Sequence, residues 1–564
     1  ADTAPYNIYF GKQICLLRGS AAFFDSINAR FFHAFIFLMI FLNFQAEYRN
    51  FCAIFSSIIK PKGDFVMKKF KISILCLLAV VIFTVSLTAV KANGAKSDVF
   101  KAQTDYITAE NLALSKASDK FKKLTDGNYS SCCNLFRKGG VQIDLDLESA
   151  QDFNCIVLKE KGLNIKSFTV LASADGETFA EIYEGDKIEY HRLCTFDTVN
   201  ARYIRIFIND ADQAFALREI EVYNQQPVDR SDFRTTAYIL NSDFYTVMDD
   251  EAIPEDEKRD AVIEMLRNYH FSGLTHVNFY CGVSFDENGN VLLNGLQNDE
   301  KSEKDLAFMM DCMRELGGED LKIVYTIGLS TGSPQTEPAM TENKDVFIDN
   351  LISFANTFGF DGIDFDYEFP QSDYEYQIFG DLLVELKERM NSEMNVGENN
   401  ILSCAFGTRD IDYPKEVVEA IDIVNMMTYD IFDQDGQHSS FWSCAVQGVA
   451  YLESVGFTRD QINIGIPFYG TQTDALTEQY IYKDIQNYGY FDNTYTFNSY
   501  FNGEPTQVYF NSAALVRDKT AYAVLSDCGG IMAWHFSCDT DYASEYALWR
   551  AVYDAEDQFG GAQQ

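Results

Sequence analysis

The sequence predicts two folded units, a β-sandwich followed by an α/β barrel of parallel strands. Its 564 residues exceed the size of one ordinary domain. Between residues 105 and 225, short runs with alternating apolar residues follow one another with little helical pattern, which favours an all-β fold. Between residues 235 and 555, apolar strand-like runs alternate with helical patterns, which is typical of a parallel α/β architecture.

The start of the chain is predicted to contain a targeting segment and no domain. After Met67, three lysines precede an uncharged apolar stretch, and Val90-Lys91-Ala92 offers small side chains for cleavage, so residues 67–92 have the three parts of a signal peptide. We therefore expect translation to start at Met67 and residues 1–66 to be an over-extended reading frame. An uncleaved anchor is the alternative, because Ile72 to Val90 is long enough to span a membrane.

Composition and charge narrow the class of partner. The chain is 47% hydrophobic and 15% aromatic, enough for large cores. Its formal net charge of −39 argues against nucleic acid and anionic membrane surfaces as partners. We expect a secreted, monomeric protein that has no membrane association once the signal peptide is removed.

Residues 105–225 are predicted to form a sandwich (jelly-roll) domain. Phe168 to Ser173 and Phe179 to Gly185 flank an Asp-Gly turn and predict a hairpin, and Ala201 to Ile208 and Arg218 to Asn224 alternate as half-buried strands. With LTDGNYSS at Leu124, these segments resemble the F5/8 type C, or discoidin-like, family, which includes carbohydrate-binding modules. The resemblance implies a sugar-binding module; a purely structural spacer is the alternative. Residues 226–234 are predicted to be a linker.

Residues 235–555 contain eight strand-like runs, which predicts a TIM (β/α)8 barrel with its active site at the carboxyl ends of the strands. The helix after the fourth run begins with a capping box formed by Ser372 and Glu375. The eight predicted strands are Thr235–Asn241, Thr275–Val283, Leu321–Leu329, Phe360–Glu368, Ile401–Thr408, Ile421–Asp430, Ile462–Gly470 and Gly529–Ser537.

The fourth strand, FDGIDFDYEFP, ends in a row of acids. Side chains alternate along a strand, so Asp364, Asp366 and Glu368 share one face and Tyr367 lies on the other. Carboxyl groups this close repel each other when both are charged, so their pKa values move apart and one stays protonated beside an ionised one. A protonated and an ionised carboxyl side by side are the catalytic pair of a glycoside hydrolase. The alternatives from spacing alone are a calcium site and a solvated acidic edge.

DGIDFDYE closely resembles the D-G-x-D-x-D-x-E signature of the family-18 glycoside hydrolases, which include chitinases and endo-β-N-acetylglucosaminidases. The resemblance extends from Phe233 to about Tyr553. It departs from the family at Tyr367, where chitinases commonly have Trp. We expect this side chain to face the helix layer.

Three other strand ends carry family-like residues. MTYD, with Met427, Tyr429 and Asp430, resembles the M-x-Y-D segment, and GIPFYG places Tyr469 near the cleft. The family places a Trp under the sugar where Trp534 stands. A single buried Tyr or Trp is usually core, but this coincidence at several strand ends favours a shared site.

The resemblance implies retaining hydrolysis in which the substrate's own N-acetyl oxygen is the nucleophile. Glu368 would protonate the leaving oxygen, Asp366 would bind the acetamido N–H, and Asp364 would tune Asp366. Tyr429 would donate to the acetamido oxygen. Met427, Asp430, Tyr469 and Trp534 would bind substrate. No metal or cofactor is expected, and no cysteine spacing resembles a zinc site.

The expected substrate is an N-acetylglucosamine-containing polysaccharide or glycan, with β-1,4 linkages of chitin or chitooligosaccharides first. The chain has only three Trp, and the connection from Gly470 to Gly529 is expected to lack the insertion domain that deepens some chitinase clefts. An endo-β-N-acetylglucosaminidase acting on the chitobiose core of N-glycans is therefore the alternative. A non-catalytic chitinase-like lectin is a further one, disfavoured because Glu368 is present.

Overall fold

The computed structural model describes residues 121–296, 299–407, 411, 413–430, 440–472, 475–487, 496–501 and 504–561. The predicted reading-frame extension, the signal peptide and the first part of the predicted sandwich lie outside these residues. In the described part of the chain, none of the helices combines the length and the apolar character that crossing a bilayer requires.

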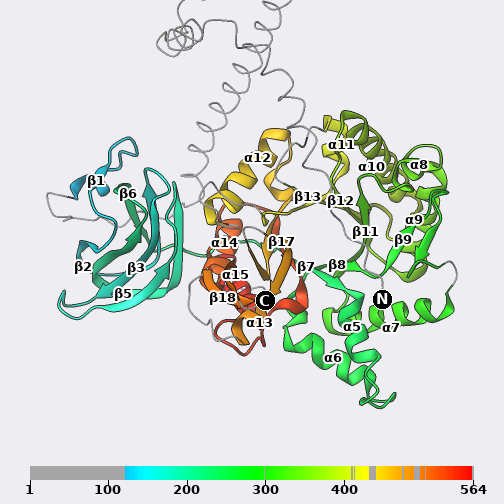
Figure 1. Cartoon of the computed structure of the whole chain (residues 1–564), viewed down its shortest axis with the longest axis horizontal. Helices are drawn as coiled ribbons and strands as arrows, with labels where there is room; N and C mark the ends of the chain where they lie inside the picture. Colours follow the sequence, from blue (N-terminus) through cyan, green and yellow to red (C-terminus); the bar gives the residue numbers. More distant parts are fainter. Residues whose placement is uncertain are drawn as a thin grey trace, which may run out of the picture. The chain divides into compact units, whose positions relative to one another are not determined.

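From residue 121 to 223, where the structure describes the first unit, it contains β-strands and one short 3-10 turn, as the sequence predicts (Figure 1). Its antiparallel sheet has the order β1-β6-β2-β5-β3-β4. Bulges in the two long strands, β2 and β5, bend the sheet around a core of its own. The predicted hairpin is confirmed by the pairing of β3 with β4. The strands are β1 (Cys133–Leu135), β2 (Val141–Glu160), β3 (Ile165–Ser173), β4 (Ala180–Gly185), β5 (Arg192–Ala211) and β6 (Phe215–Tyr223).

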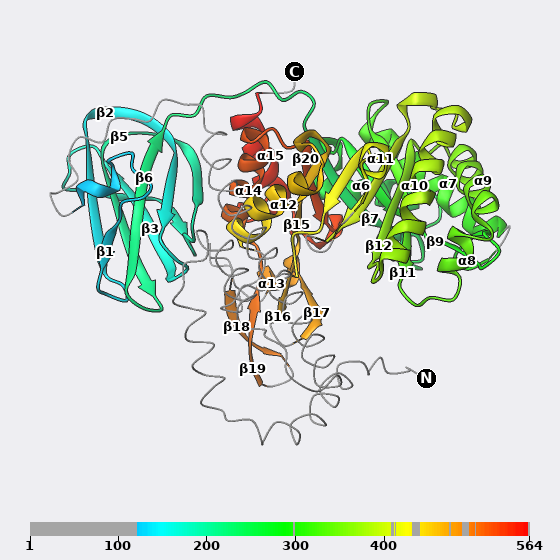
Figure 2. The ribbon, with the colours of Figure 1, turned by 90° about the horizontal axis from the view of Figure 1, so that it is seen from above.

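The second unit is a closed barrel of eight parallel strands in the order β11-β12-β13-β14-β15-β20-β7-β8, which confirms the predicted barrel (Figure 2). Each observed strand overlaps a predicted one. The barrel strands are β7 (Arg234–Leu240), β8 (His276–Tyr280), β11 (Lys322–Ser330), β12 (Gly362–Glu368), β13 (Ile401–Phe406), β14 (Ile423–Met426), β15 (Ile462–Pro467) and β20 (Gly530–Trp534).

Helices cover the outer face of the barrel (Figures 1 and 2). Tyr367 of β12 is buried and packs edge-on against Phe379 at 5.3 Å between ring centroids, so the expectation that it faces the helix layer is confirmed. The helices include α5 (Asn241–Met248), α6 (Lys258–Asn268), α7 (Glu300–Gly317), α9 (Lys344–Phe358), α10 (Asp373–Glu393), α11 (Lys415–Ala420), α12 (Gln447–Val455), α14 (Ala513–Leu525) and α15 (Leu548–Phe559).

The start of α10 follows the predicted cap with one difference. The Ser372 hydroxyl accepts a hydrogen bond from the backbone N–H of Glu375 at 3.2 Å. In a capping box the Glu375 carboxylate would accept a hydrogen bond from the backbone N–H of Ser372, but here it accepts from the backbone N–H of Gln371. This cap fixes the point where the chain leaves β12 and turns into the helix, directly after the acidic row.

The expectation that the connection after the seventh strand has no insertion domain is wrong. A four-stranded antiparallel sheet of order β17-β16-β19-β18 and one short helix lie between β15 and β20. Strands need only about five residues each, so a small sheet fits in a connection of this length. Its elements are β16 (Tyr469–Gln472), β17 (Ala475–Ile481), α13 (Tyr482–Asn487), β18 (Thr496–Phe501) and β19 (Glu504–Tyr509).

A buried carboxylate joins the sheet of the first unit to the barrel. Asp518 of α14 accepts hydrogen bonds from the backbone and hydroxyl of Thr195, both at 2.8 Å, and from the hydroxyl of Tyr183 at 2.6 Å. Its carboxylate lies 3.1 Å from the guanidinium of Arg192. These groups are all buried, so the contact is a paired and hydrogen-bonded charge inside the protein.

Candidate active site

The register of the barrel sets the surroundings of each acid on β12. Asp364 lies level with Thr326 of β11 and Ser403 of β13. Asp366, one step nearer the carboxyl end, lies level with Gly328 and Ala405. Asp364 is therefore flanked by two hydroxyl groups, whereas Gly328 and Ala405 offer Asp366 no polar side chain.

Asp364 is completely buried inside the barrel and fully hydrogen-bonded. Its Oδ2 accepts from the hydroxyls of Tyr238 at 2.9 Å and Thr326 at 3.0 Å. Its Oδ1 accepts from the hydroxyl of Ser403 and from the amide of Asn425. Burial raises the pKa of Asp364, and the four donors oppose that rise, because they favour the ionised form.

Asp366 has a strongly shifted pKa. Burial, helped by the neighbouring Glu368 and Asp364, raises the pKa of Asp366 to about 7, against a hydrogen bond from Tyr280 that lowers it. The Tyr280 hydroxyl donates to Oδ2 at 2.5 Å. Oδ1 is buried and has no hydrogen-bond partner among the described residues. Asp366 therefore offers one free acceptor atom and a protonation state that changes near neutral pH.

Glu368 stands at the open end of β12, where its side chain reaches solvent. Partial burial and the negative charge of Asp430 raise the pKa of Glu368. Glu368 and Asp366 thus both have raised pKa values and lie on one face of one strand. Two carboxyls in this relation titrate as a pair that holds a proton at higher pH than an isolated carboxyl.

Tyr429, Asp430 and Tyr469 lie beside the acids, as the sequence predicts. Burial and the carboxylates of Asp366 and Glu368 raise the pKa of Tyr429 well above its usual range. The ring of Tyr469 packs edge-on against that of Tyr429 at 6.0 Å. Burial, the charge of Asp430 and a hydrogen bond with it raise the pKa of Tyr469. Both phenols therefore remain protonated and keep an O–H to donate.

An apolar cluster brings the remaining predicted residues to the same place. Met427 is buried with Tyr238, Ala405 and Met532, and Trp534, Tyr280 and Tyr429 pack against this group. Trp534 is half-buried, and its ring lies 5.4 Å from that of Tyr238. Met427, Tyr429 and Trp534 thus meet in one cluster, and Asp430 and Tyr469 are linked to it through Tyr429 and through the hydrogen bond between them.

Sequence reasoning missed the residues that hold the acids. Tyr238 lies inside the first barrel strand and Tyr280 ends the second, and Thr326, Ser403 and Asn425 point into the barrel from three others. A signal was present, because each stands at an interior position of a predicted strand. Which interior positions face a given acid depends on the stagger between strands, which the sequence does not show.

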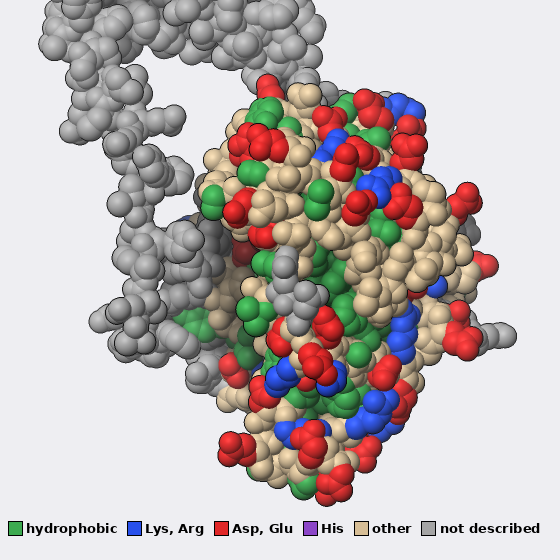
Figure 3. Space-filling model, turned by 90° about the vertical axis from the view of Figure 1, so that its right-hand side faces the viewer, with side chains coloured by type: hydrophobic (Ala, Val, Ile, Leu, Met, Phe, Trp, Pro, Cys, Tyr) green, Lys and Arg blue, Asp and Glu red, His purple; other side chains and the backbone are tan. Residues whose placement is uncertain are grey.

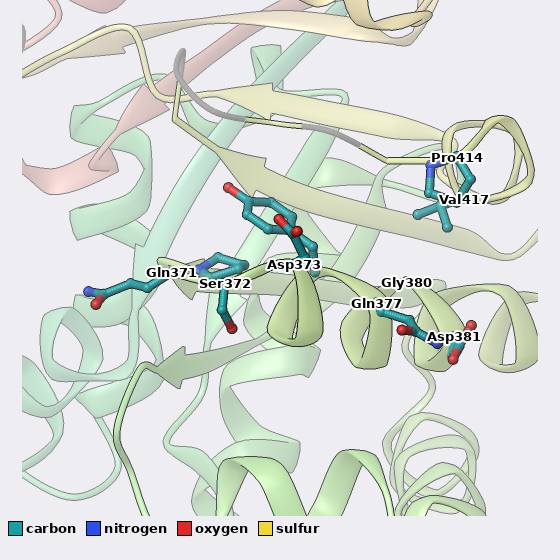
Figure 4. Close-up of a pocket in the computed structure, with 10 residues that line it drawn as sticks. Gln371, Ser372, Asp373, Gln377, Gly380, Asp381, Pro414 and Val417 are labelled. Atoms are coloured by element: carbon teal, nitrogen blue, oxygen red, sulfur yellow. The ribbon is translucent and has the colours of Figure 1, made fainter. Parts of the chain in front are cut away.

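A cavity among the described residues lies apart from this site. It has a volume of about 620 Å³ and lies between the start of α10 and α11 (Figure 4). None of the predicted site residues lines it. Within the described ranges, no cluster of three or more His, Cys, Asp or Glu side chains is arranged to hold a metal ion. On the face shown in Figure 3, acidic side chains are interspersed with basic ones and no continuous basic patch appears.

Comparison with known protein families divides the chain in the same way. Residues 107–220 match the F5/8 type C domain, and residues 250–539 match the Glycosyl hydrolases family 18. A probable endochitinase of Caenorhabditis elegans is 28% identical over 176 residues, which are 27% of this chain and 28% of the relative. Chitinase 1 of Aphanocladium album is 24% identical over 265 residues, 39% of this chain and 62% of the relative.

The matched part covers only 28% to 38% of the first three curated relatives. Among solved structures, GH18 chitinase ChiB of Flavobacterium johnsoniae is similar with a TM-score of 0.43 and 21% identity, over 57% of this chain and 93% of that one. A GH18 chitinase of Cycas revoluta in complex with (GlcNAc)3 has a TM-score of 0.45 and 17% identity, over 57% and 99%. With the family match spanning half of the sequence, the chain belongs to glycosyl hydrolase family 18.

Proposed function

We propose that the protein is a secreted, retaining glycoside hydrolase that cleaves β-1,4 linkages between N-acetylglucosamine units of chitin or chitooligosaccharides. The observation that carries the proposal is the carboxyl pair on β12, in which Asp366 is buried with a pKa near 7 and Glu368 is open to solvent. A proton donor at the solvent side beside a buried carboxylate is the arrangement that acid-assisted glycoside cleavage needs.

Glu368 is the proposed general acid, because its carboxyl has a raised pKa and lies at the open end of the strand. It protonates the leaving glycosidic oxygen and later removes a proton from the attacking water. The substrate's acetamido oxygen attacks the anomeric carbon and forms an oxazolinium ion as the glycosidic bond breaks. Asp366 accepts the acetamido N–H at its free Oδ1, and Tyr429 donates to the acetamido oxygen.

The substrate class rests on the family and on the relatives. The relatives named above are chitinases, and the Cycas revoluta enzyme has been solved with (GlcNAc)3. The half-buried ring of Trp534, packed on Tyr238, offers an apolar floor for a sugar. Action on the chitobiose core of N-glycans is not favoured by these observations, and one of its supporting expectations, the missing insertion domain, is wrong.

The first test replaces the proposed acid. Glu368→Gln should lower kcat on chitotetraose by at least about a hundredfold and leave the thermal midpoint nearly unchanged, because only the transferable proton is removed. Glu319→Gln, at an exposed position before β11, is the matched control and should keep wild-type turnover. Chromatography of the products from chitotetraose and from a high-mannose glycoprotein measures both activity and substrate class.

Wild-type turnover by the Glu368→Gln variant would remove Glu368 from its role. A wild-type protein that releases glycans from the glycoprotein and leaves chitotetraose intact would instead identify an endo-β-N-acetylglucosaminidase. Binding of chitotetraose without any product from either substrate would identify a lectin.

The second test separates the acetamido group from a protein nucleophile. A chitotetraose analogue without N-acetyl groups should be cleaved at less than about 1% of the rate of chitotetraose, because it lacks the attacking oxygen. Mass spectrometry of the protein during turnover of this analogue provides the second measurement. Efficient cleavage, or a glycosyl ester trapped on Asp366, would show that Asp366 attacks the sugar directly.

A further inference from the structure

Tyr280 stands out among the residues that sequence reasoning missed, because it acts on Asp366 directly. Its hydroxyl makes the only side-chain hydrogen bond to Asp366 that the described part of the chain contains, at 2.5 Å from Oδ2. The other oxygen of the same carboxyl, Oδ1, remains without a partner there. One oxygen is thus held by the protein and one is left for a ligand.

The contact between Tyr280 and Asp366 crosses the strand that lies between them. Tyr280 ends β8 and Asp366 lies on β12, with β11 between them. The residue of β11 level with Asp366 is Gly328. A Cβ atom added at Gly328 would lie 3.9 Å from Cε1 and 4.0 Å from the hydroxyl of Tyr280. A methyl group at this position would only touch the tyrosine, so glycine keeps the path of Tyr280 across the intervening strand clear, and a side chain larger than alanine would enter that path.

The ring of Tyr280 is fixed by its neighbours. It packs edge-on against Trp534 at 5.8 Å between ring centroids and lies at a tilt against Tyr238 at 5.9 Å. Burial and the charges of Asp366 and Asp364 raise the pKa of Tyr280 far above its usual range. The phenol therefore keeps its proton over the whole working pH range and stays a hydrogen-bond donor.

We propose that Tyr280 is a positioning residue that holds Oδ2 of Asp366, aims the free Oδ1 at the acetamido N–H, and keeps Asp366 ionised. The identity of the group that Oδ1 binds rests on the proposed function, whereas the contact of Tyr280 with Oδ2 does not. A donor to a buried carboxylate stabilises its charged form, which is the form that accepts the acetamido N–H and offsets the developing cation.

The groups facing Asp366 are all neutral or acidic in the described residues. They are Asp364 and Glu368 on its own strand, the phenols of Tyr238, Tyr280 and Tyr429 on three neighbouring segments, and Asp430 beside Tyr429. No cation compensates the carboxylate there, so the hydrogen bond from Tyr280 carries more of the stabilisation than it would beside an arginine.

The experiment compares Tyr280→Phe with the wild type. The variant keeps the ring that packs on Trp534 and loses only the donor. The acid limb of the profile of kcat/KM against pH should move to higher pH by about one unit, the scale of a lost hydrogen bond to a charged group. Activity at pH 5 should fall about tenfold relative to the wild type, and activity at pH 8 should fall less.

Tyr325→Phe is the matched control. Tyr325 is a fully buried tyrosine of β11 whose hydroxyl donates to the backbone oxygen of Leu351 at 2.8 Å, away from the acids. This variant also loses a buried hydroxyl, and its acid limb should stay at the wild-type pH. In an Asp366→Asn background, Tyr280→Phe should have little further effect, because the interaction through which it acts is already changed.

Thermal unfolding gives a readout that does not depend on activity. The thermal midpoint of Tyr280→Phe should fall more at pH 8, where Asp366 is ionised, than at pH 5, whereas that of Tyr325→Phe should fall equally at both. An unchanged acid limb, or the same loss of midpoint at both pH values, would overturn the role of Tyr280. A wild type inactive on all substrates would refute the proposed function and leave the thermal test of Tyr280 decisive.

Discussion

At the scale of single residues, the site keeps unfavourable charges that stability alone would not select. Asp364 is fully buried and Asp366 is partly buried, on one face of one strand. Hydrogen bonds compensate Asp364 on both oxygens, whereas one oxygen of Asp366 has no partner in the described residues. The oxygen without a partner, Oδ1, is the one proposed to bind substrate. The free-energy cost of burying a charged group is therefore concentrated at the substrate-binding atom.

This strain predicts a stabilising substitution. The pKa of Asp366 is raised from 3.8 in the unfolded chain to about 7, so the folded protein loses stability as pH rises between these values. Asp366→Asn removes this loss, and its thermal midpoint should exceed that of the wild type by an amount that grows from pH 4 to about pH 7 and then levels off. The gain should be of the order of a few kcal/mol.

Thermal unfolding measured at several pH values from 4 to 8 tests this prediction. Asp320→Asn, at an exposed turn, is the control for the effect of replacing an aspartate by an asparagine. The control should shift the midpoint little and by a similar amount at every pH. A difference between Asp366→Asn and the wild type that is constant from pH 4 to pH 8 would mean that Asp366 ionises as freely in the folded protein as in the unfolded chain.

At the scale of elements, a glycine at the start of β12 sets the position of the acids that follow it. A Cβ atom added at Gly362 would lie 2.0 Å from the backbone oxygen of Ile401, so the close approach of β12 to β13 requires glycine there. That approach sets the register that places Asp364 level with Ser403. The donor to the buried acid is thus positioned by a glycine two residues before it.

At the scale of the whole molecule, the two folded units are joined by a buried charge. Asp518 of the barrel is buried with Arg192 of the sheet at 3.1 Å and accepts three hydrogen bonds from Thr195 and Tyr183. The chain between the units is also held: the Arg230 guanidinium donates to the backbone oxygens of Val524 and Cys528 at 2.9 and 2.6 Å. The first unit is therefore packed against the barrel through buried, hydrogen-bonded groups.

Breaking the contact between Asp518 and Arg192 should lower the free energy of unfolding. Asp518→Asn removes the charge that pairs with buried Arg192 and should cost about 3 kcal/mol or more, the scale for a buried pair that loses one partner. Asp197→Asn is the matched control, because it breaks the neighbouring Arg517–Asp197 pair, 2.9 Å apart, in which the Asp197 side chain is exposed. The control should cost no more than about 1 kcal/mol.

Urea unfolding at pH 7, followed by fluorescence, compares the two variants with the wild type. Equal losses for Asp518→Asn and Asp197→Asn would show that the buried contact contributes no more than a surface pair, and that the two units are stable independently.

The sequence by itself determined the barrel, its eight strands, the β-rich unit before it and the row of acids. These follow from local patterns, since the period of apolar residues defines each strand and alternation puts Asp364, Asp366 and Glu368 on one face. Tyr429 and Trp534 were found because family motifs mark their strand ends. Each of these signals lies within about ten consecutive residues.

Only the tertiary structure decided which residues act on the acids. Tyr280 reaches Asp366 across 86 positions of sequence and over an intervening strand, and Tyr238 reaches Asp364 across 126. The insertion sheet after β15 and the contact of Asp518 with Arg192 were likewise missed. The physical reason is the same in each case. These contacts depend on the stagger between strands, the closure of the sheet and the packing of distant segments, and none of these produces a periodic pattern of residues in the local sequence.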